Sequence, residues 1–138
     1  MSQVSRPLPK PTPETDHFWQ GCKASELRLQ RCGQCAHVYY PPRPFCPSCS
    51  CRDVEIFRAS GKGTLASYVI NYRPHPAWDA PYSIAIVELE EGPRMATNIV
   101  NCPQTPDALT IDMAVEVVFE AASEDITLPL FQPVGDRS

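Results

Sequence analysis

Apolar and polar residues alternate along most of the chain with the two-residue period of β-strands. This alternation predicts three short strands, at residues 27–31, 37–40 and 54–58. After the turn signal Gly61-Lys62-Gly63 it predicts five more, at 64–72, 82–90, 94–100, 115–120 and 126–131. Five short antiparallel strands favour a small barrel, because closing the sheet removes its exposed edges. We therefore expect a mainly β chain that ends in a five-stranded OB-fold barrel.

One early stretch departs from this alternation and has the signals of a helix. Thr12 is a suitable N-cap and Pro13 suits the first helical position, so we expect a short helix at about 13–22. Phe18 and Trp19 lie on one face of this helix. That aromatic face either packs on the body of the protein or forms a docking surface for another subunit.

Prolines divide the rest of the chain into segments. The chain has 16 prolines in 138 residues, and those before residue 13 alternate with other residues, which favours extended backbone. Stiff, proline-rich loops are also predicted between the cysteine pairs and at 73–81. We expect an extended arm at 1–12, a helical segment at 13–25, a metal-binding ribbon at 26–59, and the barrel with a short C-terminal tail at 60–138.

The strongest chemical signal is a pair of Cys-x-x-Cys motifs, formed by Cys32 with Cys35 and by Cys46 with Cys49. Each motif points two sulfurs toward one centre, and two motifs complete a tetrahedral site for Zn²⁺. Such a site has no open position for water, so the metal has a structural role and one Zn²⁺ per chain is expected. Iron in a rubredoxin-like site and a redox-active dithiol are alternatives. Cys51 is interpreted as a bystander.

Composition and charge narrow the function classes. The 138 residues contain seven cysteines, no apolar run long enough to span a membrane and no signal peptide, which predicts a soluble, cytoplasmic protein with reduced thiols. Residues 1–73 carry ten Lys and Arg against five Asp and Glu, whereas residues 74–138 carry two against eleven. The basic first part and the acidic second part are expected to face different partners. The overall net charge of −4 argues against general nucleic-acid binding.

A catalytic constellation is not predicted. The thiols and imidazoles outside the two motifs are Cys22, Cys51, Cys102, His17, His37 and His75, and no spacing links a thiol to a base. His75 and Asp79 could form an acid–base pair, but their proline-rich loop is equally typical of a lid or a contact loop. Neither a Walker loop nor a dinucleotide fingerprint is present.

In its motif order the chain resembles the OB-fold proteins with an N-terminal rubredoxin-like zinc ribbon that accompany acyl-CoA enzymes. The resemblance covers roughly residues 14–133. It rests on Phe18-Trp19, Leu27, Leu29, the two cysteine motifs, Pro41-Pro42-Arg43, Gly61-x-Gly63 and Val115-x-Val-Val-Phe119. Where that family usually carries a glycine before its last core strands, this chain has Ile111-Asp112-Met113.

The resemblance implies a non-catalytic accessory subunit of a hetero-oligomeric complex. The implied partners are thiolase-like acyltransferases, including those that acylate phloroglucinol-type aromatics, and, as an alternative, MaoC-like enoyl-CoA hydratases or lipid-transfer-type aldolases. Such a subunit helps to assemble the complex and to shape the acyl-CoA channel. Candidate contacts with coenzyme A or the partner are Arg43, Arg52, Lys62, Phe18, Trp19 and Trp78.

Two function classes compete with this interpretation. Zinc ribbons and OB barrels also occur in nucleic-acid-binding proteins, but those need a basic, aromatic-lined face, and residues 74–138, which form most of the barrel here, have a net charge of −9. A rubredoxin-like electron carrier is the other possibility, and a red iron chromophore would reveal it. We expect neither nucleic-acid nor membrane binding.

Overall fold

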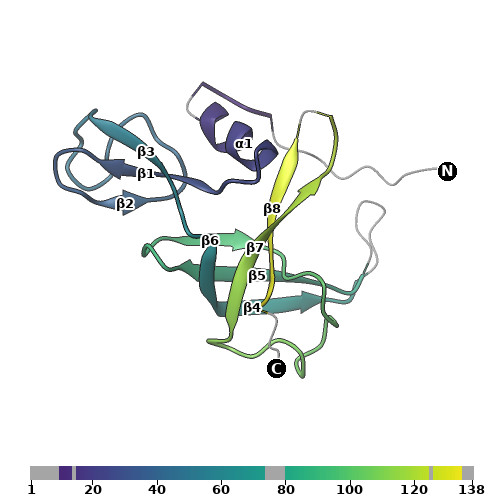
Figure 1. Cartoon of the computed structure of the whole chain (residues 1–138). Helices are drawn as coiled ribbons and strands as arrows, with labels where there is room; N and C mark the ends of the chain where they lie inside the picture. The colour runs from purple at the N-terminus through teal and green to yellow at the C-terminus, as the bar shows by residue number, and fades with distance from the viewer. Residues whose placement is uncertain (1–9, 14, 74–79, 125, 135–138) are drawn as a thin grey trace.

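A computed structural model describes residues 10–13, 15–73, 80–124 and 126–134. The elements are α1 (Asp16–Lys23), β1 (Arg28–Cys32), β2 (Val38–Tyr39), β3 (Val54–Arg58), β4 (Lys62–Asn71), β5 (Tyr82–Leu89), β6 (Arg94–Thr97), β7 (Ala114–Ala121) and β8 (Thr127–Pro133). The short helix lies above the sheet of β4–β8, and β1–β3 form a separate lobe beside it (Figure 1). The predicted mainly β fold is confirmed. Among the described residues, no helix is long and apolar enough to cross a membrane.

The first sheet has the order β2-β1-β3 and is antiparallel throughout. β1 pairs with β3 over its whole length, from Arg28 opposite Arg58 to Cys32 opposite Val54. This pairing holds the start of the ribbon segment, β1, beside its end, β3. The loops between these strands are therefore held at one end of the lobe.

The second sheet has the order β6-β5-β4-β7-β8 and curls into a half-barrel. An isolated parallel bridge joins Ile99, just after β6, to Phe131 on β8. The N–H of Val100 donates to the carbonyl of Phe131 at 2.8 Å, and the N–H of Phe131 donates to the carbonyl of Asn98 at 3.1 Å. The two outer strands of the sheet are thereby brought together, as expected of an OB fold.

One apolar core connects the barrel to the base of the ribbon and to the helix. Leu65, Val87, Val115 and Phe131 of the barrel are fully buried. The same core includes Phe18 and Cys22 from α1, Leu27 before β1, Leu29 on β1 and Ala59 after β3. The helix and the first part of the ribbon are therefore packed onto the barrel.

The helix begins later than the predicted start at residue 13. The N–H groups of Thr15 and Asp16 both donate to the carbonyl of Thr12, at 3.0 and 2.8 Å, and Thr15 takes the N-cap position. A separate turn therefore occupies the place of the first predicted helical turn. The sequence signal marked the right region but not the right residue.

Asp112 forms the tight connection before β7, in the segment Ile111-Asp112-Met113. Its φ is 73°, in the left-handed region that Asp adopts more easily than most residues. Its N–H donates to the carbonyl of Leu65 at 2.7 Å. The tight connection before β7 is therefore formed without glycine.

Candidate metal centre

Two backbone turns of the same design hold the four cysteines. In the first, the N–H of Ala36 donates to the carbonyl of Cys32 at 2.9 Å; in the second, the N–H of Ser50 donates to the carbonyl of Cys46 at 2.8 Å. Ala36 and Ser50 both have positive φ, 64° and 68°. Each turn therefore folds back on itself directly after its second cysteine, and this directs both of its sulfurs inward.

Gly33 lies close to Asp53 in the first turn. A Cβ at this position would displace the exposed side chain of Asp53. The N–H of Gly33 donates to the carbonyl of Asp53 at 2.7 Å. The glycine thus allows the turn to approach the segment that leads into β3.

The four sulfurs converge on one point. The Sγ atoms of Cys32, Cys35, Cys46 and Cys49 all lie within 4.8 Å of one another. Two of the separations are 3.6 Å, from Cys32 to Cys49, and 3.7 Å, from Cys35 to Cys46. A tetrahedron with Zn–S bonds of about 2.3 Å has edges of about 3.8 Å. The donor set and its spacing therefore fit Zn²⁺.

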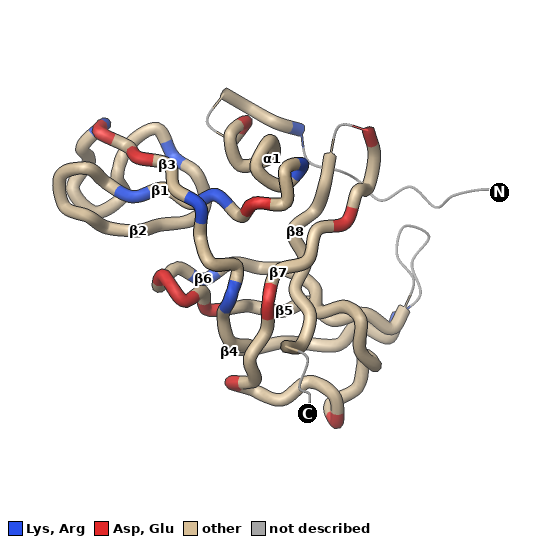
Figure 2. Tube along the Cα trace, in the orientation of Figure 1, with Lys and Arg blue, Asp and Glu red and all other residues tan. Residues whose placement is uncertain are grey.

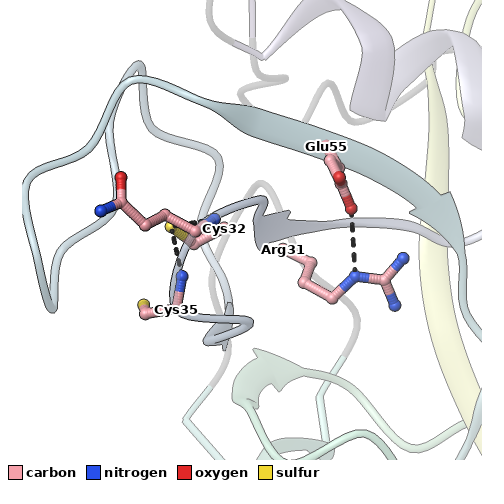
Figure 3. A network of polar contacts seen from close by, with 5 residues as sticks. Arg31, Cys32, Cys35 and Glu55 are labelled. Carbon is pink, nitrogen blue, oxygen red and sulfur yellow. Dashed lines mark hydrogen bonds and ion pairs between the residues drawn. The ribbon is translucent and has the colours of Figure 1, made fainter.

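Backbone N–H groups surround the sulfurs. Gln34 and Cys35 both donate to Sγ of Cys32 at 3.3 Å (Figure 3). Ser48 and Cys49 donate to Sγ of Cys46 in the same way, at 3.3 and 3.4 Å. The bond from Cys35, helped by that from Gln34, lowers the pKa of the Cys32 thiol to about 6. The turns thus lower the pKa of the first cysteine of each motif, Cys32 and Cys46, and favour its thiolate, which is the form that binds metal. The neighbouring sulfurs contribute to a raised pKa at Cys35 and Cys49.

Cys51 lies beside the centre but outside the group of four sulfurs. It packs against the small buried cluster of Cys32, Tyr39 and Cys46, and its Sγ accepts from the N–H of Asp53 at 3.4 Å. Four sulfurs already fill a tetrahedral shell, so a bound metal has no open position at which water could be activated. A zinc ion held by these four sulfurs would therefore have a structural role.

A buried glutamine positions the loop between the two turns, and sequence reasoning missed it. Gln30 is 4% exposed, and its Oε1 accepts from the N–H of Arg43 at 2.8 Å. Gln30 is a polar residue that alternates with Leu27 and Leu29, a pattern that by itself indicates the solvent side of a strand. In the ribbon, however, the 41–44 loop contacts this face of β1 through the N–H of Arg43.

The predicted contact residues lie at different places in the structure. Arg43 lines a cleft of about 560 Å³ between the ribbon and the β5–β6 turn, together with His37, Tyr39, Glu91 and Arg94. Arg52 is exposed on the ribbon, and Lys62 lines a different groove, beside Glu88 and Glu116. Trp78 lies outside the described residues, as do His75 and Asp79. Arg94 was not predicted, because its own stretch of sequence carries no signal for a position beside the ribbon.

The aromatic pair of the helix serves mainly in packing. Phe18 is 2% exposed and meets Trp19 edge-on, with ring centroids 5.0 Å apart, and Tyr40 at 5.5 Å. The expectation that Phe18 contacts a partner is therefore wrong, because its ring is inside the core. Trp19 is half-buried at the edge of the same cluster.

Cys22 and Cys102 are poor nucleophiles. Burial raises the pKa of Cys22 to about 12, and burial also raises the pKa of Cys102. Both therefore stay protonated at neutral pH. His37 stacks on the ring of Tyr39 at 5.8 Å. Among the described residues, Cys22, Cys102 and His37 are therefore packed against other side chains.

Two family models match this architecture. Residues 19–55 match the ChsH2 rubredoxin-like zinc ribbon domain, and residues 58–120 match the ChsH2 C-terminal OB-fold domain. A DUF35 domain-containing scaffold protein of Methanothermobacter thermautotrophicus is 41% identical over 116 residues, which are 81% of this chain and 86% of that protein. The chain belongs to the DUF35 family, in which a rubredoxin-like zinc ribbon precedes an OB fold.

Other relatives are parts of acyl-CoA enzymes by name. A probable enoyl-CoA hydratase alpha subunit of Thermomonospora curvata is 39% identical over 91% of this chain, and this chain covers 40% of that subunit. Subunit BbsA of a benzoylsuccinyl-CoA thiolase of Thauera aromatica is 28% identical over 59% of this chain, which covers 56% of BbsA. Among solved structures, a chain of an Ltp2-ChsH2(DUF35) aldolase is 36% identical, with a TM-score of 0.81 over 91% of this chain and 98% of that one.

Proposed function

We propose that this chain is a non-catalytic, zinc-containing accessory subunit of a multi-subunit acyl-CoA enzyme, with one Zn²⁺ per chain. The enzyme is a thiolase-like acyltransferase or a complex that forms or cleaves C–C bonds. The chain helps to assemble that complex and to shape its acyl-CoA channel.

The observation that carries this proposal is the closed four-sulfur centre. Four cysteine sulfurs within 4.8 Å leave no ligand position for substrate, and burial keeps Cys22 and Cys102 protonated. The likeness to the DUF35 chain of an aldolase extends over 98% of that chain and supports a C–C bond-forming or -cleaving partner. The catalytic groups then come from the partner.

A hydratase-like partner is the second candidate. It is supported by the 39% identity to a probable enoyl-CoA hydratase alpha subunit over 91% of this chain. This chain covers 40% of that subunit's length, so the remainder of such a hydratase would have to be a separate polypeptide or domain.

Co-expression with the thiolase- or hydratase-sized subunit encoded in a neighbouring reading frame tests the proposal. We expect the two chains to elute together in size-exclusion chromatography, with one zinc per accessory chain by elemental analysis. A monodisperse single chain that turns over acyl-CoA without any partner would contradict the proposal.

Within such a complex, the cleft beside the ribbon is our candidate for contact with coenzyme A phosphates. It places Arg43 of the ribbon and Arg94 of β6 along one opening of about 560 Å³. We expect Arg43→Ala to weaken acyl-CoA binding by the assembled complex about tenfold, as for loss of one charge-assisted contact. Arg58→Ala removes an exposed ribbon arginine on β3 that does not line this cleft and is the matched control. Equal affinity for Arg43→Ala and wild type would exclude the phosphate role of Arg43.

A further inference from the structure

Tyr39 on β2 belongs to the small buried cluster at the metal centre. Its side chain is 4% exposed and packs with Cys32 and Cys46, one ligand from each cysteine motif. His37 stacks on its ring, with the ring centroids 5.8 Å apart and an angle of 18° between the planes. The ring therefore contacts an imidazole and also two of the four cysteines that form the centre.

Strand pairing fixes the side of the ribbon on which this ring lies. Tyr39 is opposite Gln30 of β1, and residues opposite each other in antiparallel strands point to the same side of the sheet. Gln30 holds the loop that leads to Cys46, because its Oε1 accepts the N–H of Arg43 at 2.8 Å. The ring and the loop into the second motif therefore lie on the same side of the ribbon sheet.

The hydroxyl of Tyr39 is closed to solvent and has no hydrogen-bond partner among the described residues. A buried polar group of this kind has lost its contacts with water, which costs free energy unless a partner compensates for them. Such groups are rare in native proteins, and each one needs an explanation. The surroundings of the ring show which groups could provide the partner.

Charges of both signs act on this hydroxyl. Burial raises the pKa of Tyr39, the charges of the Cys46 and Cys32 sulfurs raise it further, and the Arg43 guanidinium lowers it. The hydroxyl therefore keeps its proton at neutral pH. A guanidinium only donates hydrogen bonds, whereas sulfur accepts them. Among these charged groups, the sulfurs are therefore the acceptors for the O–H of Tyr39.

A bound metal strengthens the demand for donors at the sulfurs. Four thiolates around one Zn²⁺ leave an excess of negative charge. Backbone N–H groups already donate to the Sγ atoms of Cys32 and Cys46, two to each, at 3.3–3.4 Å. The hydroxyl of Tyr39 adds a side-chain donor beside the same two cysteines.

We propose that the Tyr39 hydroxyl is a donor to the thiolates of Cys32 and Cys46 and thereby strengthens the binding of Zn²⁺. Tyr39 is then a positioning residue of the metal centre, because it acts on the metal through the sulfurs. Donors that surround metal ligands typically change metal affinity by about 10–100-fold. The inference concerns the metal centre alone and does not depend on which enzyme the chain joins.

The test compares two tyrosine variants of the full chain. Tyr39→Phe removes the hydroxyl and keeps the ring. Tyr40→Phe is the matched control, because Tyr40 is a half-buried neighbour whose ring packs on Phe18 in the other apolar cluster. In competition with a chromogenic chelator, we expect Tyr39→Phe to bind Zn²⁺ about tenfold more weakly and Tyr40→Phe to differ from wild type by less than about twofold.

Cobalt distinguishes a donor from a side chain that only packs. Co²⁺ bound to thiolates absorbs light by transfer of charge from sulfur to metal, and a hydrogen bond to sulfur moves this band to shorter wavelength. We expect the band of Co²⁺-loaded Tyr39→Phe to lie at longer wavelength than that of wild type. The band of Tyr40→Phe should not move.

Three results would overturn the inference. The first is equal Zn²⁺ affinity of Tyr39→Phe and wild type. The second is weaker Zn²⁺ binding by Tyr39→Phe with an unchanged cobalt band, because altered packing alone would then explain the loss. The third is an equal loss of affinity in Tyr40→Phe, because the effect would then not depend on a hydroxyl beside the sulfurs.

Discussion

The ribbon and the barrel are both small antiparallel β structures in one chain, yet different forces hold them. In the outer ribbon the buried cluster consists of Cys32, Tyr39 and Cys46, with Cys51 packed against it. In the barrel, residues such as Leu65, Val87 and Phe131 are fully buried in a core that also reaches the helix. A few side chains cannot offset the entropy of ordering some 20 residues, so the ribbon depends on its metal whereas the barrel does not.

The ribbon and the barrel also differ in charge. Arginines lie along the ribbon, and acidic positions gather at the turn between β5 and β6, beneath the ribbon lobe (Figure 2). Glu91 in that turn accepts the N–H of Ser60 at 2.7 Å, so the turn is tied to the junction between the two regions. The comparison shows one lobe held by metal and one held by its apolar core, joined by the apolar residues at the base of the ribbon and by this hydrogen bond.

The largest effect is expected from loss of the metal. Cys46→Ser removes one of four sulfurs and with it most of a binding free energy of about 10–16 kcal/mol for a structural zinc site. We expect the amides of residues 32–53 to exchange rapidly with deuterium, while those of β5 and β7 stay protected. Cys51→Ser, the matched control, should keep one zinc and normal protection. If Cys46→Ser removes protection from both regions, the claim that only the ribbon depends on the metal is wrong.

A substitution in the barrel core should destabilise the barrel and leave the metal centre intact. Phe131 is fully buried on β8, so Phe131→Ala is expected to lower the free energy of unfolding by about 3–5 kcal/mol. Urea denaturation followed by tryptophan fluorescence measures this loss. Metal content at low denaturant should be unchanged, and release of zinc from the folded variant would show that the ribbon relies on the barrel core.

A smaller effect is expected at Gln30. Gln30→Met keeps the approximate size of the side chain but leaves the N–H of Arg43 without its acceptor. We expect a loss of about 1–3 kcal/mol, confined to the 41–44 loop, and a faster rate of zinc transfer to a chelator. Gln30→Glu retains an oxygen acceptor and should transfer zinc at nearly the wild-type rate.

The smallest effect is expected at the rim of the barrel. Glu88 and Arg94 form an exposed pair, with side chains 49% and 65% accessible. Glu88→Gln should therefore change the free energy of unfolding by less than about 1 kcal/mol. A larger loss in thermal denaturation would mean that this pair contributes to the barrel more than an exposed ion pair does.

Sequence patterns predicted the barrel and the metal centre well, for a physical reason. Strict alternation marks strands that are buried on one side, as in β5, and cysteine spacing follows directly from tetrahedral coordination. The errors fell where tertiary contacts decide the outcome. The carbonyl of Thr12 binds two later N–H groups and delays the helix, and Phe18 enters a core that spans several elements.

Residues whose contacts join distant parts of the sequence were also beyond local patterns. Gln30 is buried because the 41–44 loop folds over it, and Arg94 joins Arg43 only because the β5–β6 turn lies against the ribbon. Neither contact has a signal within its own stretch of sequence. Such positions are fixed by tertiary contacts.

Steady-state turnover of an acyl-CoA thioester tests the accessory role most directly. The catalytic subunit, this chain loaded with zinc, and the two together are compared at equal concentrations, with thiol release as the readout. We expect no turnover by this chain, weak or no turnover by the partner alone, and full turnover only when both are present. Turnover by this chain alone, or equal turnover by the partner with and without it, would contradict the role of a non-catalytic accessory subunit.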